Sequence, residues 1–155
     1  YIYIMYYKKY LVEFFIMTMV GMLFNPMNIL ANDINDLYPS KTLLYGGFLM
    51  ASNMIWSHQI VHYFNMGHFN IDKFLIGVVL SYLISRYLLR YQFNIQDRDW
   101  LERMISHHST ALTTSKKIYE RTKNPKIKQL SKQIIDTQDK EIKLMKSYLL
   151  DKKLN

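Results

Sequence analysis

Three long apolar segments occupy the first two thirds of the chain, and none of them alternates between apolar and polar positions as a strand would. They run from about residue 10 to 30, 42 to 66 and 74 to 93. Each is close to the roughly 20 residues that an α-helix needs to cross about 30 Å of hydrocarbon. The pattern therefore predicts three membrane-spanning helices, the first interrupted by Glu13 and by Asn25-Pro26.

An alternative interpretation of these segments is a soluble protein with very apolar core helices, because each segment also contains polar residues. A cleaved signal peptide accounts poorly for the first segment, since two further segments follow it. We therefore favour a membrane region over residues 1–96.

The last third has apolar residues at every third or fourth position, which is typical of amphipathic helices. Asp97 or Asp99 is expected to cap a helix that continues to about Arg121. Asn124 followed by Pro125 predicts the start of a second helix, which continues to about residue 150. So short a connection makes the two helices antiparallel. The expected fold is all-α, with three transmembrane helices followed by a helical hairpin over residues 97–155.

Charge and composition differ between these two parts. The chain has twenty Lys+Arg and twelve Asp+Glu, and residues 101–155 hold thirteen of the basic and six of the acidic residues. The hairpin lysines are expected to form a solvated face. Nucleic-acid binding is not expected, because aromatic residues do not alternate with these lysines. The chain has no cysteine, so any site for a soft metal would use its ten methionines and five histidines.

Polar residues interrupt the apolar faces of both hairpin helices. A turn centred near Asn124 places His107 opposite Glu141, and Met104 opposite Leu144, next to Met145. Imidazole, carboxylate, amide and thioether groups at one level are suitable metal ligands. The candidate ligands are Met104, His107, His108, Gln138, Glu141 and Met145. The alternative is a buried, hydrogen-bonded histidine–glutamate pair that binds no metal.

The strings MISHHSTA at 104–111 and QIIDTQDKEIKLM at 133–145 resemble the domain of unknown function 305 family (DUF305). The family pattern is M-I-x-H-H-x-x-A, then a turn, then I-I-x-x-Q-x-x-E-I-x-x-M, and members usually have proline where this chain has Ser106. Arg90, Gln92, Ile95 and Asp97 approximately match a further family feature, RxQxxIxD. The resemblance implies a ferritin-like half bundle, and one branch of the family has three membrane spans before it. Some secreted or periplasmic members bind copper, so the resemblance implies copper here.

The second apolar segment contains Met50, Met54, His58 and His62 at four-residue intervals, which places them on one helix face. The membrane branch of the family tends to have four methionines at this spacing, so the set is a candidate second metal site within the membrane. The alternative is a packing face, since methionine and histidine also serve helix contacts in membranes. Haem is not expected, because two histidines on one helix cannot bind opposite faces of one porphyrin.

These observations predict an integral membrane protein that binds copper for sequestration or handling. The alternative is a structural membrane subunit whose hairpin docks on partner proteins without metal. We expect no enzymatic activity, because phosphate loops, nucleophile elbows and Glu-x-x-His pairs are missing from the sequence. So short a hairpin buries too little surface alone, so a second copy or a membrane partner is expected to cover it. Lys8 and Lys9 favour an inside N-terminus, which puts the hairpin in the periplasm, the lumen or the exterior.

Overall fold

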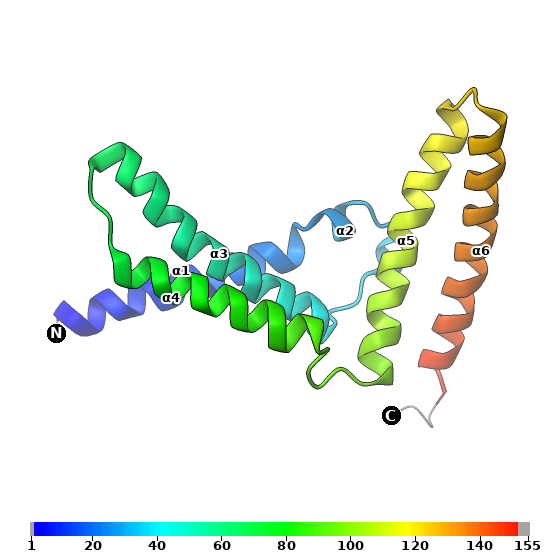
Figure 1. Cartoon of the computed structure of the whole chain (residues 1–155). Helices are drawn as coiled ribbons and strands as arrows, with labels where there is room; N and C mark the ends of the chain where they lie inside the picture. Colours follow the sequence, from blue (N-terminus) through cyan, green and yellow to red (C-terminus); the bar gives the residue numbers. More distant parts are fainter. Residues whose placement is uncertain (1, 152–155) are drawn as a thin grey trace. The chain divides into compact units, whose positions relative to one another are not determined.

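Helices form all the regular secondary structure within residues 2–151, which are the residues that the computed structural model describes (Figure 1). The chain folds as two units that alternate along the sequence. The first unit comprises residues 1–23 and 41–94, and the second comprises residues 24–40 and 95–155. The all-α prediction is confirmed for the described residues. The division differs from the predicted one in segment 24–40, which folds with the hairpin.

The first unit consists of three long helical segments. They are α1 (Ile2–Leu23), α3 (Lys41–Met66) and α4 (Ile71–Leu83), and α4 continues into a π-helical segment, η2 (Ile84–Arg90). Helix α3 packs against both α1 and α4. The contacts are close because glycines occupy them. A Cβ atom on Gly47 would lie 2.7 Å from the Thr18 carbonyl oxygen, and one on Gly77 would lie 2.7 Å from the Trp56 backbone nitrogen.

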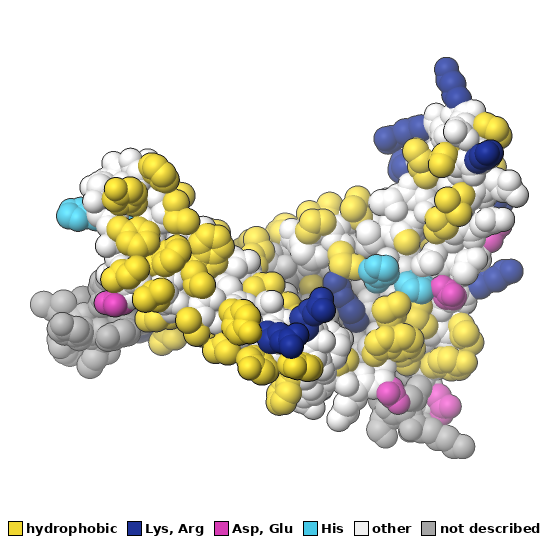
Figure 2. All heavy atoms as spheres, viewed as in Figure 1, with side chains coloured by type: hydrophobic (Ala, Val, Ile, Leu, Met, Phe, Trp, Pro, Cys, Tyr) yellow, Lys and Arg dark blue, Asp and Glu magenta, His cyan; other side chains and the backbone are white. Residues whose placement is uncertain are grey.

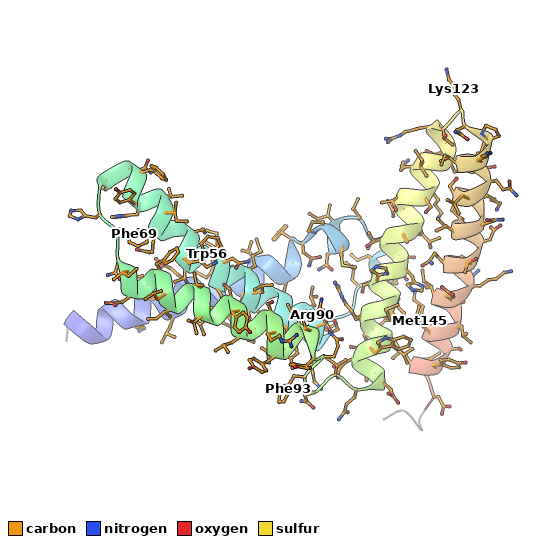
Figure 3. All side chains as sticks on the ribbon, in the orientation of Figure 1. Trp56, Phe69, Arg90, Phe93, Lys123 and Met145 are labelled. Atoms are coloured by element: carbon orange, nitrogen blue, oxygen red, sulfur yellow. The ribbon has the colours of Figure 1, made fainter. Side chains whose placement is uncertain are left out.

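Aromatic rings pack together where α3 turns into α4. Trp56 packs edge-on against Phe74, with ring centroids 6.3 Å apart, and the Phe69 ring lies 5.3 Å from that of Phe74. Figure 3 shows Trp56 on α3 and Phe69 close to the turn. Asn70 caps α4 by accepting a hydrogen bond from the Lys73 backbone N–H. These contacts hold α3 and α4 as an antiparallel pair.

The distribution of residue sizes in the first unit is the reverse of that in a soluble protein. The side chains buried between its helices are mostly small, whereas many large apolar ones are exposed (Figure 2). The buried small residues include Thr18, Gly21, Gly47, Ala51, Ser52 and Gly77. The exposed large ones include Leu11, Phe15, Ile16, Val61, Phe64, Leu75, Ile76, Val79 and Tyr82.

The prediction of three membrane spans is not supported by helix length and hydropathy. Within the described residues, one stretch, Tyr10–Ile29, is long and apolar enough to cross a membrane. Helix α3 is long enough, but its polar residues, among them Asn53 and Gln59, lower its mean hydropathy. Regular α-helix in α4 covers 13 residues, because the chain continues beyond Leu83 as η2.

The second unit is built on the predicted hairpin of α5 (Asp97–Arg121) and α6 (Pro125–Leu149). Asn124 caps α6, since its side chain accepts hydrogen bonds from the backbone N–H groups of Lys126 and Ile127. The predicted helix limits are therefore confirmed to within one residue at this turn. Figure 3 shows Lys123 in the turn and Met145 near the other end of the hairpin. Two short elements, α2 (Pro26–Ile29) and η1 (Ile34–Asp36), complete the unit.

The core of the second unit lies between α5 and α6. It consists of Leu101, Ile105, Leu112, Ile142 and Met145. Tyr38, from the segment before α3, packs against this cluster together with Met104, Ile135 and Leu149. Segment 24–40 therefore supplies part of the core of the second unit, although α1 and α3, on either side of this segment in the sequence, belong to the first unit.

Candidate metal site on the helical hairpin

His108 is the histidine that faces α6. Its Nδ1 atom lies 3.1 Å from Glu141 Oε2, and its side chain is 13% exposed whereas that of Glu141 is 45% exposed. The predicted pairing of His107 with Glu141 is therefore displaced by one residue. His107 is exposed, and its ring centroid lies 5.8 Å from that of His108. A turn centred half a residue later than we assumed accounts for the difference.

Two buried polar atoms on facing helices have no hydrogen-bond partner. They are His108 Nδ1 on α5 and Gln138 Oε1 on α6. The Glu141 carboxylate is near enough to His108 for a charge interaction, but this contact is not a hydrogen bond. Leaving a buried polar atom without a partner costs about 1–3 kcal/mol, so native structures usually supply one. Figure 2 shows histidine and acidic side chains next to each other on this face of the hairpin.

The environment of His108 favours its neutral form. Burial lowers the pKa of His108, the nearby Glu141 charge raises it in part, and His107 lowers it further. The net effect is a pKa below the ordinary value of 6.5. A neutral imidazole keeps a lone pair on one ring nitrogen, which is the form that binds metal ions.

The methionines of the predicted ligand set lie in the core of the same unit. Met145 is buried, and Met104 packs against the cluster that contains it. The predicted neighbour of Met104 on α6, Leu144, is exposed instead. Among the described residues, no group of three or more His, Cys, Asp or Glu side chains is placed to hold a metal ion. A site at this level would therefore require Gln138 or the thioethers in addition to His108 and Glu141.

Asp36, which binds the hairpin from segment 24–40, was not among the residues predicted from the sequence. Its side chain accepts a hydrogen bond from Ser109 Oγ at 2.5 Å, and its carbonyl oxygen accepts one from Ser106 Oγ at 2.7 Å. Lys146 Nζ of α6 lies 2.5 Å from the other carboxylate oxygen. Two serines on the buried face of α5 were the available signal, because a buried hydroxyl needs a partner.

The four residues of the α3 candidate set have different environments. Met50 and Met54 are 44% and 41% exposed, and Met50 Sδ packs where Gly21 leaves room on α1. The rings of His58 and His62 are neighbours, with centroids 6.1 Å apart. The structure therefore places Met50 in a helix contact and pairs the two histidines.

The geometry defines an all-helical protein with a two-helix hairpin that is held by a segment from between α1 and α3. Residues 87–149 match the family described as Domain of unknown function (DUF305). The chain is also 39% identical over 129 residues to Uncharacterized protein L153 of Acanthamoeba polyphaga mimivirus, which covers 83% of both chains. The protein thus belongs to the family of this viral protein and carries a DUF305 domain at its C-terminal end. No solved structure matches the chain.

Proposed function

We propose that the protein is a membrane-anchored metal-binding protein whose hairpin holds a copper ion between α5 and α6 for sequestration or handling. The observation that carries this proposal is the pair of buried atoms without hydrogen-bond partners, His108 Nδ1 and Gln138 Oε1. A bound cation would satisfy both lone pairs at once. No catalytic step is part of the proposal.

The chemistry of the available donors suits copper. His108 supplies an imidazole that its lowered pKa keeps neutral, and Glu141 supplies a carboxylate 3.1 Å away. The thioethers of Met104 and Met145 lie in the adjoining core and would favour Cu⁺, whereas imidazole and carboxylate serve Cu²⁺. His107 would act from the surface, as an entry ligand.

The membrane part of the proposal rests on the first unit. Its helices touch through small residues and expose large apolar ones, which is how helices pack in lipid. We infer that α1, α3 and α4 with η2 cross the bilayer. The chain order supports this arrangement, since three spans put segment 24–40 and the hairpin on the same side of the membrane, and these two parts fold as one unit. The charge of the N-terminal residues favours the periplasmic, lumenal or exterior side for that unit.

Metal analysis of the purified, untagged full chain tests the hairpin site. After dialysis against Cu²⁺ or Cu⁺, His108→Ala is expected to bind one ion fewer per chain than the wild type. His107→Ala is the matched control, because it removes the exposed imidazole next to His108. This variant should retain the ion with weaker affinity. Equal copper content in His108→Ala and the wild type would overturn the proposed site.

Site-directed labelling tests the membrane arrangement, because the chain has no cysteine of its own. Single variants Ile34→Cys and Lys123→Cys should react with an impermeant maleimide from the same side of sealed vesicles. His68→Cys, in the turn between α3 and α4, should react from the opposite side. Labelling of all three variants from one side would contradict three spans.

A structural membrane subunit is the second candidate. Large apolar side chains are exposed on the hairpin, and they would suit a partner protein or a second copy. They are Trp100, Ile118, Ile127, Leu130, Leu144 and Tyr148. The same metal analysis separates the two functions, since a docking subunit would bind no copper and His108→Ala would leave its assembly unchanged.

A further inference from the structure

The C-terminal part of α3 carries a pair of histidines that the hairpin site does not use. His58 and His62 are one turn apart on the same face of the helix, with ring centroids 6.1 Å apart and ring planes at 49°. Many metalloproteases take two of their zinc ligands from histidines that are four residues apart on a helix. The spacing of the two residues and the proximity of their rings would allow both imidazoles to bind one ion.

A backbone contact fixes the orientation of one of the two rings. His62 Nδ1 lies 3.0 Å from the carbonyl oxygen of His68. A carbonyl oxygen only accepts hydrogen bonds, so Nδ1 must carry the proton and Nε2 of the neutral ring must present a lone pair. Metal-binding histidines usually donate their second ring N–H in this way, which fixes the tautomer and the ring orientation.

The turn after α3 holds that carbonyl group in place. Gly67 adopts a positive φ of 69°, and its N–H donates to the Tyr63 carbonyl oxygen at 2.9 Å. The chain then reverses and brings His68 back toward His62. Because the ring is held by the turn, little rotamer freedom remains to be lost when an ion binds.

The location of the pair fits ion access. Helix α3 ends at Met66. At about 1.5 Å per residue, His62 and His58 lie about 6 and 12 Å from that end. His58 is exposed and His62 is half-buried. The pair therefore lies near one end of α3 and outside the packed interior of the first unit.

We propose that His58 and His62 form a two-imidazole site for a divalent transition-metal ion, with Cu²⁺ bound more tightly than Zn²⁺. The remaining coordination positions would be filled by water or by a donor from another molecule. Met50 is not part of this site, because its thioether packs over Gly21. The site is independent of the hairpin site, since its residues belong to the other unit.

Copper and zinc binding in a His107→Ala, His108→Ala background tests the proposal, because that background removes the hairpin imidazoles. Purified, untagged full chain in detergent is dialysed against Cu²⁺ or Zn²⁺, and the Cu²⁺ form is examined by electron paramagnetic resonance. We expect one Cu²⁺ per chain with coupling to two imidazole nitrogens. Adding His58→Ala or His62→Ala should weaken binding by at least about tenfold, and far-UV circular dichroism should show unchanged helix content.

Two control variants sharpen the result. His68→Ala keeps the backbone carbonyl group and should bind Cu²⁺ like the background protein. Met54→Leu should also bind normally, and loss of the ion in this variant would overturn a two-imidazole site in favour of a mixed thioether set. Unchanged Cu²⁺ affinity in both His58→Ala and His62→Ala would overturn the proposal outright. Absence of bound Cu²⁺ from the His107→Ala, His108→Ala background would also overturn the α3 site, whereas loss of one of two ions in that background supports both sites.

Discussion

Asp36 Oδ1 lies 2.5 Å from Lys146 Nζ, so a residue that precedes α3 forms an ion pair with the last turns of α6. The Asp36 side chain is 5% exposed and that of Lys146 is 34% exposed. Ser106 and Ser109 of α5 hydrogen-bond to the same residue. One carboxylate therefore connects segment 24–40 to both hairpin helices.

Asp36→Asn should destabilise the second unit by about 2–3 kcal/mol, because Lys146 would lose its charged partner in a mostly buried location. Hydrogen exchange of the α5 and α6 amides measures the change. Asp136→Asn is the matched control, since its pair with Lys132 is exposed and should contribute much less to stability. Equal effects of the two variants would contradict a central role for Asp36.

Ser109→Ala should destabilise the same unit by about 1–2 kcal/mol, since the fully buried hydroxyl donates to the Asp36 carboxylate. Ser147→Ala removes an exposed hydroxyl from α6 and serves as the control. Its effect is expected to stay within about 0.5 kcal/mol. The difference between the two variants, measured by exchange of the same amides, reports the contribution of the buried bond.

The ion pair should also make stability depend on alkaline pH. Burial by itself lowers the pKa of Lys146, but the hydrogen bond from Lys146 to Asp36 and the Asp36 charge outweigh it and raise the pKa above 10.5. The folded state thus binds this proton more tightly than the unfolded state. Its contribution to stability is fully present below pH 10.5 and declines as the pH rises through the raised pKa. Lys146→Met should lose less stability than the wild type between pH 9 and pH 11.5.

Gly47→Ala should loosen the contact of α1 with α3, because the new Cβ would lie 2.7 Å from the rigid Thr18 carbonyl group. Overpacking of this kind costs about 1–3 kcal/mol. Gly46→Ala is a close control, since its Cβ would have no neighbour within 4 Å. It should be neutral or slightly stabilising, because alanine favours helix over glycine by about 1 kcal/mol. Thermal unfolding in detergent distinguishes the two, and equal midpoints would contradict the close contact.

The helices of the hairpin were predictable because their signals are local. The Asn124-Pro125 start of α6 and the apolar period of α5 need no knowledge of the rest of the chain. The choice between His107 and His108 was not predictable to one residue, because the register depends on how the turn closes. The role of Asp36 was not predictable, because its partners are distant in the sequence. Nothing local distinguishes a carboxylate in an exposed loop from one that is buried against a lysine and two serines of other helices. The three membrane spans were predicted from the lengths of the apolar segments. Segment length does not account for the polar residues that lower the mean hydropathy of α3, or for the end of α4 at Leu83.

The alternation of the two units along the chain limits how this protein can be divided. The family match covers residues 87–149, but a fragment with those limits would lack the whole of segment 24–40. Lys146 would then have no carboxylate at its side, and the core cluster would lose Tyr38. The domain that sequence comparison delimits is therefore smaller than the unit that folds, and a transplantable version of the hairpin must carry residues 24–40 with it.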